Sequence, residues 1–388
     1  MKKRTLVNHP PSTLPPVGNR AVIAPIYQSV KYEFDTVDDA LAVFRGERPG
    51  YFYMRSSNPT TRQLELTLAA LQGRADCLAT ASGVNAVIQT LLALTKQGDH
   101  IVVFVESYPP TRAIARRFLA RFGVEHTMLS IEDLDSLERV LATRPTRLVL
   151  FESPTNPMLK VADIERIVSL AHRHGALAVL DNTFAGFHQH GQYEVDVFVH
   201  SLTKYASGAG DVMGGAAIAS KELIAEMRRE FELLGALLDP HAAFLLQRSL
   251  KTYFLRYREQ CVSALAIASW LEQQSAVAAV RYPGLASHPQ ASLAARQMSD
   301  MGSVITFRLR AGDDAGARFT EALQLFAMTA SLGSAESLVL PPQMLGGKDL
   351  TAAEYAASGL APGTIRFSIG LEDVDDLIAD LEQALGKI

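Results

Sequence analysis

Short apolar runs alternate with helix-like patterns between residue 77 and about residue 220. The runs are typical of buried strands, whereas the segments between them carry apolar residues at helical spacing. Strands that are apolar on both faces and separated by helices predict a mostly parallel sheet covered on both sides. The expected strands are 77–81, 100–105, 147–152, 176–181, 195–200 and 212–219, and the expected helices are 84–95, 110–122, 162–174 and 221–234.

The N-terminal region has a different pattern. Residues 1–50 are rich in proline and aromatic residues and lack sustained periodicity. They predict an extended arm, wrapped on another subunit in one interpretation and a loosely ordered tail in the other. Asn58 and Pro59 then predict the start of a helix, and Gly73 predicts its end.

The C-terminal region predicts a smaller α+β domain. Residues 240–273 predict one long helix or two, and after Pro283 and Gly284 the pattern of apolar and polar residues changes. Strand-like runs at 303–309, 327–331 and 364–369 mix there with helices near 315–325 and 373–386. We therefore expect an N-terminal arm over residues 1–55, a cofactor-binding domain over 56–250 and a C-terminal domain over 251–388.

Composition narrows the function classes. The 388 residues include 37 Lys and Arg against 41 Asp and Glu, a net charge of -4. This balance provides neither a basic surface for nucleic acid nor a polybasic membrane anchor. No apolar run is long enough for a membrane span, and no apolar segment of a signal peptide follows the first residues. Two cysteines exclude a disulfide framework and lead us to expect a cytoplasmic protein.

Candidate chemistry gathers at the ends of the predicted strands, where parallel sheets bind ligands. Gly83 begins a helix whose free N–H groups attract anions, although many turns contain such a glycine. Asp181 directly follows an apolar run and must be paired, either as a helix cap or as the partner of a cationic ligand atom. Lys204 lies beside Ser201 and Thr203, where desolvation can lower its pKa and make the amine nucleophilic. Together these residues match the needs of pyridoxal phosphate (PLP): a lysine, an acid and a phosphate cradle.

Several motifs in order make the chain resemble the Cys/Met-metabolism, or trans-sulfuration, family of PLP-dependent enzymes from about residue 20 to 375. The strongest marker lies around His200-Ser201-Leu202-Thr203-Lys204-Tyr205. Supporting motifs are Tyr53-Met54-Arg55, Glu152-Ser153-Pro154-Thr155-Asn156-Pro157, Asp181-Asn182-Thr183-Phe184, Ser331-Leu332-Gly333 with Glu336-Ser337-Leu338, and Arg366-Phe367-Ser368-Ile369-Gly370. The resemblance implies an α/β protein with the type I, aspartate-aminotransferase-like fold of PLP enzymes.

The resemblance also implies roles for individual residues. Lys204 would form the Schiff base with the cofactor, and Asp181 would hold the pyridine nitrogen protonated. Tyr108 would stack on the ring and assist the leaving group, and Arg366 would grip the substrate carboxylate with Ser337 nearby. The remaining implied cofactor contacts are Gly83, Val84, Ser201 and Thr203 at the phosphate, Asn156 at the ring oxygen, and Tyr53 and Arg55 from a neighbouring subunit. The last pair requires at least a dimer, and the resemblance to the family implies a homotetramer.

Several segments depart from the family pattern, among them the stretch from Asp181 to Lys204 and residues 208–211, which lack the family's His. Pro109 and Pro110 follow Tyr108 where the family carries glycine, and residues 341–346 replace a family segment near the substrate. His188 and His190 form a His-x-His pair, but no third ligand is evident, so no metal site is expected.

The implied activity is γ-elimination or γ-replacement on a sulfur-containing or O-acylated amino acid, as in cystathionine γ-lyase, cystathionine γ-synthase or methionine γ-lyase. The alternatives are a cystathionine β-lyase, a specialised γ-replacement enzyme with another substrate, and a non-catalytic PLP-binding homologue. A nicotinamide-dependent enzyme is disfavoured because the glycine fingerprint is missing.

Overall fold

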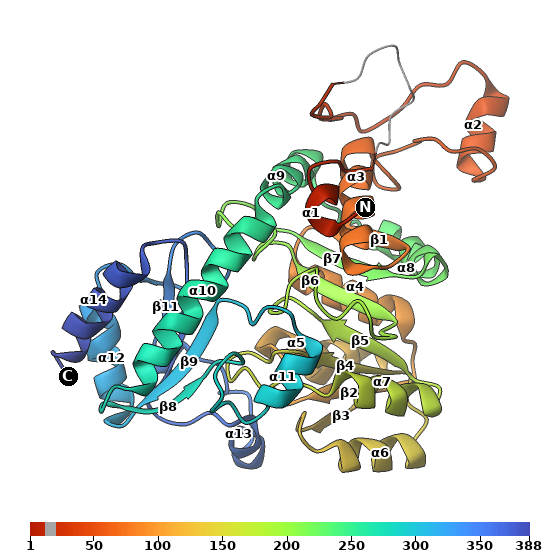
Figure 1. Ribbon diagram of the computed structural model, residues 1–388. Helices are drawn as coiled ribbons and strands as arrows, with labels where there is room; N and C mark the ends of the chain where they lie inside the picture. The colour runs from red at the N-terminus through yellow and green to blue at the C-terminus, as the bar shows by residue number, and fades with distance from the viewer. Residues whose placement is uncertain (12–20) are drawn as a thin grey trace.

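The computed structural model describes residues 1–11 and 21–388, and a seven-stranded sheet forms the centre of its larger part (Figure 1). Six strands of this sheet run in the same direction, and only β7 is antiparallel to both of its neighbours. The order across the sheet is β1 (Asp76–Thr80), β7 (Gly215–Ala219), β6 (Val197–Ser201), β5 (Leu177–Asp181), β4 (Leu148–Glu152), β2 (His100–Phe104) and β3 (Glu125–Leu129). This arrangement confirms the predicted mostly parallel sheet.

Helices cover both faces of this sheet because its central strands are apolar on both sides. Along β2, Val102 and Phe104 enter one core, whereas Ile101 and Val103 enter the other. The first core is covered by α3 (Pro59–Gln72), α6 (Leu134–Thr143), α7 (Ile164–Arg173) and α9 (Pro240–Leu250). The second is covered by α4 (Gly83–Leu94), α8 (Lys221–Leu234) and the π-helical turn η1 (Ile114–Phe118).

A second sheet of five strands belongs to the C-terminal part of the chain (Figure 1). Its order is β10 (Ala327–Met328), β11 (Leu338–Leu340), β12 (Thr364–Ser368), β9 (Val304–Leu309) and β8 (Val277–Arg281). The helices α10 (Tyr253–Glu272), α12 (Gly312–Ala322) and α14 (Val374–Leu385) enclose an apolar core with it, around Phe307, Phe319 and Phe367. Three short helices, α11 (Ala291–Gln297), η3 (Pro342–Met344) and α13 (Ala352–Ser358), complete this part.

The N-terminal segment carries two short helices, α1 (Lys3–Leu6) and α2 (Val37–Phe44). Figure 1 shows α2 well apart from both sheets. The predicted arm also includes residues 12–20, which lie outside the described residues. Within the described part, no helix is long and apolar enough to cross a membrane. Cys77 and Cys261 are free thiols.

Most predicted elements are confirmed, with small shifts at their ends. The predicted helix over 110–122 is instead three successive pieces: α5 (Pro109–Ala113), η1 and the 3-10 turn η2 (Leu119–Phe122). The segment 240–273 forms two helices, α9 and α10, and the predicted strand at 327–331 is only the two-residue β10. The sequence patterns missed β3, α6, β8 and β11. The boundaries expected at residues 55 and 250 stay predictions.

Candidate active site

A cavity of about 490 Å³ lies where the carboxyl ends of β4, β5 and β6 meet the C-terminal part of the chain. Glu152, Asp181 and Ser201, the last residues of these three strands, all line it. The N-terminus of α4, the turn after β2 and segments around Ser331 and Arg366 provide the remaining walls. The sheet edge that the strand pattern indicated as the ligand site is therefore the edge that holds the cavity.

Lys204 enters the cavity from the turn after β6. Its Nζ donates a hydrogen bond of 2.9 Å to Ser331 Oγ, which comes from the C-terminal part of the chain. Burial, and secondarily the charge of Arg366, lower the pKa of Lys204 to about 8. About a tenth of this amine is thus neutral and nucleophilic at pH 7, far more than at the ordinary lysine pKa.

Two carboxyl groups lie next to each other at the strand ends, since Glu152 and Asp181 are paired in the register of β4 and β5. Burial raises the pKa of both, and the proximity of Asp181 raises that of Glu152 further. Among the described residues, Thr183 donates to Asp181 from its backbone N at 3.1 Å and from its Oγ1 at 2.6 Å, both to Oδ1. Oδ2 remains for another donor, and a cation placed there would favour the charged carboxylates.

The start of α4 packs tightly against the end of β6. Ser82 caps the helix by accepting from Asn85 N at 3.1 Å. A Cβ atom added to Gly83 would lie 2.6 Å from Ser201 Cβ, so this position admits only glycine without a shift of the backbone. Val84 and Thr203 line the same cavity. The helix start and the nearby hydroxyl groups form an anion-binding corner.

This corner has no cation of its own among the described residues. The cationic side chains that line the cavity are Arg112, Lys204 and Arg366. Arg112 is held by Asp349, with 2.6 Å between its Nη2 and Oδ1, while Lys204 and Arg366 serve other parts of the cavity. A phosphate dianion in this corner would therefore need a cationic partner from elsewhere.

Arg366 extends from β12 into the cavity, and its neighbours Ile365 and Phe367 point into the core behind the sheet, as the period-2 pattern predicts. Its Nη1 donates to Asn156 Oδ1 at 2.7 Å, and its Nη2 donates to the Ser331 carbonyl at 2.7 Å. The buried Nε has no partner among the described residues. A buried donor without an acceptor is costly, and a bound carboxylate would supply the missing acceptor.

Tyr108 stands at the cavity wall, half exposed, at the N-terminal cap of α5. Its backbone N–H donates to the Glu152 carboxylate, which fixes the turn. Pro109 and Pro110 occupy the first two positions of α5, where proline is tolerated because those N–H groups have no helical acceptor. Burial and the nearby Glu152 raise the pKa of the Tyr108 hydroxyl, so it is protonated near neutral pH.

Three predicted site residues lie outside the cavity lining. Ser337 is fully buried, where its Oγ donates to Glu372 at 2.8 Å and accepts from Gly370 N at 2.9 Å. Tyr53 and Arg55 belong to the arm, with the Arg55 guanidinium 5.1 Å from the centre of the Tyr53 ring. Their placement within one chain leaves their predicted roles untested.

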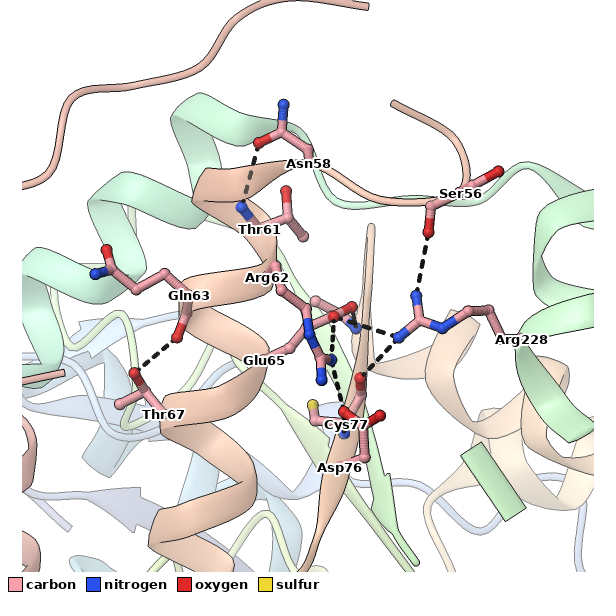
Figure 2. A network of polar contacts seen from close by, with 11 residues as sticks. Ser56, Asn58, Thr61, Arg62, Gln63, Glu65, Thr67, Asp76, Cys77 and Arg228 are labelled. Atoms are coloured by element: carbon pink, nitrogen blue, oxygen red, sulfur yellow. Dashed lines mark hydrogen bonds and ion pairs between the residues drawn. The ribbon is translucent and has the colours of Figure 1, made fainter. Parts of the chain in front are cut away.

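The base of the arm is fixed to the body by a polar network (Figure 2). Arg228 of α8 donates to the Ser56 carbonyl at 3.3 Å and forms an ion pair with Glu65 at 3.4 Å. Arg62 bridges Glu65 at 3.0 Å and Asp76 at 2.6 Å. These contacts hold the segment that directly follows Tyr53 and Arg55.

Sequence reasoning missed two contributors to the site. Ser331 holds both Lys204 and the Arg366 guanidinium, but the sequence patterns included it only as part of a motif. Glu152 supports Tyr108 and neighbours Asp181. A buried acid at the end of an apolar run was the available signal for Glu152, as it was for Asp181.

The His-x-His pair lies away from the cavity lining. His188 contacts Tyr253 Oη at 2.9 Å and Asp300 at 3.1 Å, and His190 contacts Asn182 Oδ1 at 2.7 Å. Burial lowers the pKa of His190 to about 3, which keeps it neutral. The described residues hold no cluster of three or more metal-ligating side chains.

The cavity residues fit the cofactor that the resemblance implies. A desolvated amine can join the PLP aldehyde, and the adjacent buried carboxyls suit a protonated pyridine nitrogen. The corner at Gly83 suits a phosphate, and the unpartnered Nε of Arg366 suits the carboxylate of an amino acid.

Comparisons with known proteins agree with this reading. The family model described as Cys/Met metabolism PLP-dependent enzyme matches residues 5–386. L-methionine gamma-lyase of Pseudomonas putida is 42% identical over 94% of this chain and 92% of its own length. O-succinylhomoserine sulfhydrylase of Pseudomonas aeruginosa is 36% identical over 94% and 90%.

A solved structure from Campylobacter jejuni, provisionally assigned as an O-acetylhomoserine (thiol)-lyase, superposes with a TM-score of 0.92 at 32% identity. The match covers 100% of both chains, and that protein carries N'-pyridoxyl-lysine-5'-monophosphate.

Proposed function

The chain belongs to the Cys/Met metabolism family of PLP-dependent enzymes, and on this premise we propose how its own residues carry out the reaction. The chemistry is that of trans-sulfuration, γ-elimination or γ-replacement on an amino acid. The observation that carries the residue assignment is the convergence of Lys204, Asp181 and Arg366 on one cavity. The nicotinamide-dependent alternative does not account for that convergence, and the intact Lys204, Asp181 and Arg366 argue against a non-catalytic homologue.

PLP, when bound, supplies an aldehyde for the amine and a ring that withdraws electrons from the substrate Cα. Lys204 is the proposed cofactor lysine, and Asp181 Oδ2 is the proposed partner of the ring nitrogen. Gly83, Val84, Ser201 and Thr203 are the proposed phosphate contacts, since they line the cavity beside the start of α4. Asn156 lies close enough to Arg366 to orient both the ring side and the substrate side of the site.

Proton transfers in this proposal belong to Lys204 and Tyr108. With the cofactor and substrate bound, the Lys204 Nζ would take the proton from the substrate Cα, which its depressed pKa allows near neutral pH. The Tyr108 hydroxyl gives a proton to the departing γ-substituent, consistent with its raised pKa. Ser331 Oγ accepts from Nζ at 2.9 Å and keeps the amine oriented.

Arg366 is the proposed carboxylate anchor of the substrate. Its Nη atoms are held by Asn156 and by the Ser331 carbonyl, so the guanidinium is already oriented before substrate arrives. A fixed bidentate fork reduces the entropy lost on binding and sets the Cα–H bond in one direction.

We also propose a homo-oligomer in which Tyr53 and Arg55 complete the phosphate site of a neighbouring subunit. Two observations support this: no described residue places a free cation in the lining of the phosphate corner, and the arm exposes large apolar side chains. Val22, Val37 and Phe44 are 99%, 75% and 71% exposed. Apolar surface of this kind is covered in a stable protein, and a second copy of this chain would cover it.

Mixing two inactive variants tests this arrangement. Arg55→Met and Lys204→Met chains, denatured and refolded together, should regain about a quarter of the wild-type activity in randomly assorted dimers, because one site per mixed dimer is intact. Each variant refolded alone is the control. Mixed chains that stay inactive despite forming an oligomer would contradict the shared site.

Product identification tests the reaction itself. The cofactor-loaded enzyme is incubated with L-methionine, with cystathionine, and with O-acylhomoserine plus a thiol, and the products are identified by mass. γ-Elimination gives 2-oxobutanoate, γ-replacement gives a new thioether, and β-elimination of cystathionine gives pyruvate. The expected products are 2-oxobutanoate or a thioether, lost in Lys204→Met, whereas pyruvate alone would overturn the assignment to γ-chemistry.

A further inference from the structure

The far wall of the cavity is formed by one segment of the C-terminal part, residues 340–360, called here the wall segment. It lies opposite the turn that carries Tyr108. The wall-segment side chains that line the cavity are almost all apolar: Leu340, Met344, Leu345, Leu350 and Leu360, with Gly346 and Ser358. The two sides touch, since a Cβ atom added to Gly346 would lie 2.8 Å from Pro109 Cγ.

Arg112 joins the wall segment to the large sheet domain. Its Nε donates to Asp349 Oδ2 at 2.8 Å and its Nη2 to Asp349 Oδ1 at 2.6 Å, a bidentate pair. Its Nη1 donates to the Val105 carbonyl at 3.0 Å and to the Ser107 carbonyl, which anchors the guanidinium at the end of β2. The Arg112 side chain is only 4% exposed, so its head cannot move without losing these bonds.

A second cation reinforces the same attachment. Arg116 donates to the Asp349 carbonyl at 2.7 Å and pairs with Glu354 at the start of α13. The bond from Arg112 also holds the pKa of the Asp349 carboxyl below its usual range, so the pair is charged at neutral pH. Ion pairs with Arg112 and Arg116 therefore hold the outer side of the wall segment, while apolar side chains on its inner side face the cavity.

The charged groups that line the cavity are all engaged in the described residues. Glu106 accepts from Lys160 Nζ at 2.9 Å, and Arg112 is held by Asp349. Glu152 accepts from the Tyr108 backbone N–H, and in the proposed function Asp181 and Lys204 serve the cofactor while Arg366 serves the α-carboxylate. Among the described residues that line the cavity, no charged group remains for a second ammonium or carboxylate at the far end of the substrate.

We infer that Arg112 and Asp349 are positioning residues that hold the wall segment against the cavity and so select an amino acid whose γ-substituent is apolar. This inference rests on the proposed function for its substrate and on the geometry of the pair for its mechanism. A thioether with a short alkyl group fits the wall, whereas cystathionine would place a second charged end against it.

Two measurements on Asp349→Asn test the inference. Asp349 is preferred over Arg112 because its side chain is 39% exposed, so the variant is expected to fold. Asp135→Asn is the matched control, since it breaks an exposed ion pair with Arg166, 2.9 Å long, far from the cavity lining. Asp349→Glu, which keeps the charge, should restore much of the wild-type behaviour.

The first measurement is hydrogen–deuterium exchange of the cofactor-loaded enzyme, read out by mass spectrometry of peptides that cover residues 344–357. Amides such as Leu350 N, which donates to Gly347 O at 3.0 Å, report whether the segment stays in place. Uptake should rise there in Asp349→Asn and stay unchanged in Asp135→Asn. Unchanged uptake in Asp349→Asn would overturn the positioning role.

The second measurement is the ratio of kcat/KM for L-methionine to kcat/KM for cystathionine. The ratio should fall about tenfold in Asp349→Asn. Losing one charge-assisted pair loosens the wall segment, so its apolar side chains contact bound methionine less well and the KM for methionine rises. An unchanged ratio with raised uptake would overturn the selective role. A wild-type enzyme inactive on every γ-substituted substrate would contradict the proposed function, while the exchange result would still decide the positioning role.

Discussion

Replacing Lys204 with methionine is expected to stabilise the cofactor-free protein at neutral pH. The wild-type amine is partly buried, and burial followed by the charge of Arg366 lowers its pKa from 10.5 to about 8. The unfolded chain keeps the ordinary pKa, so it binds more protons than the folded chain between about pH 8 and pH 10.5. Wild-type stability should therefore rise with pH across that window, and the variant should lack this rise.

The magnitude follows from the same values. Below pH 8 the folded wild type holds a poorly solvated charge at a cost of about 3 kcal/mol, since a tenfold change in protonation is worth about 1.4 kcal/mol. Methionine removes this cost but also removes the bond to Ser331, worth about 1 kcal/mol. The net gain is about 2 kcal/mol at pH 7, falling to a loss of about 1 kcal/mol above pH 10.5.

Urea unfolding at fixed protein concentration, after removal of the cofactor, measures this difference at several pH values between 7 and 10.5. Lys221→Met is the control, because Lys221 is exposed on α8 and its ammonium is solvated in both states. A Lys204→Met variant that is no more stable than wild type at pH 7, with a difference independent of pH, would refute the desolvation of Lys204.

Three further substitutions test the rest of the site. Arg366→Met should lower kcat/KM about 100-fold, mainly by raising KM, because the substrate carboxylate loses a bidentate donor. An unchanged KM would show that Arg366 does not bind the substrate. Asp181→Asn should shift the visible absorption of the bound cofactor and lower kcat, since a neutral amide does not hold the ring nitrogen protonated; a wild-type spectrum and kcat would contradict its role. Gly83→Ala should weaken cofactor affinity about tenfold or more, because the added Cβ would lie 2.6 Å from Ser201 Cβ. Equilibrium dialysis measures this affinity, and an unchanged value would show that the cofactor does not use this corner.

The sequence predicted the larger sheet well because its central strands are buried on both faces. β2 and β4 are buried along their whole length, so each reads as a continuous apolar run. β3 was missed for the opposite reason: it is an edge strand with Glu125, His126 and Thr127, and it is partly exposed throughout. β8 and β11 were missed because short or alanine-rich strands give little periodic signal.

Site residues with a local sequence signal could be predicted, whereas contacts between residues far apart in the sequence could not. Lys204, Asp181 and Gly83 could be found because each lies directly at a strand end or helix start. The bond from Lys204 to Ser331 and the pair of Arg112 with Asp349 join residues 127 and 237 positions apart, and no local pattern indicates such partners. The altered segments at Pro109 and at 341–346, noted only as departures, prove to be the two facing walls of the cavity.

Borohydride reduction of the cofactor-loaded enzyme, followed by digestion and mass identification of the modified peptide, decides which lysine binds the cofactor. Reduction fixes the cofactor covalently to the lysine amine it has joined, and we expect this lysine to be Lys204. The Lys204→Met variant should carry no such label. A label on another lysine, or bound cofactor that is never fixed to the peptide containing Lys204, would show that Lys204 is not the cofactor lysine.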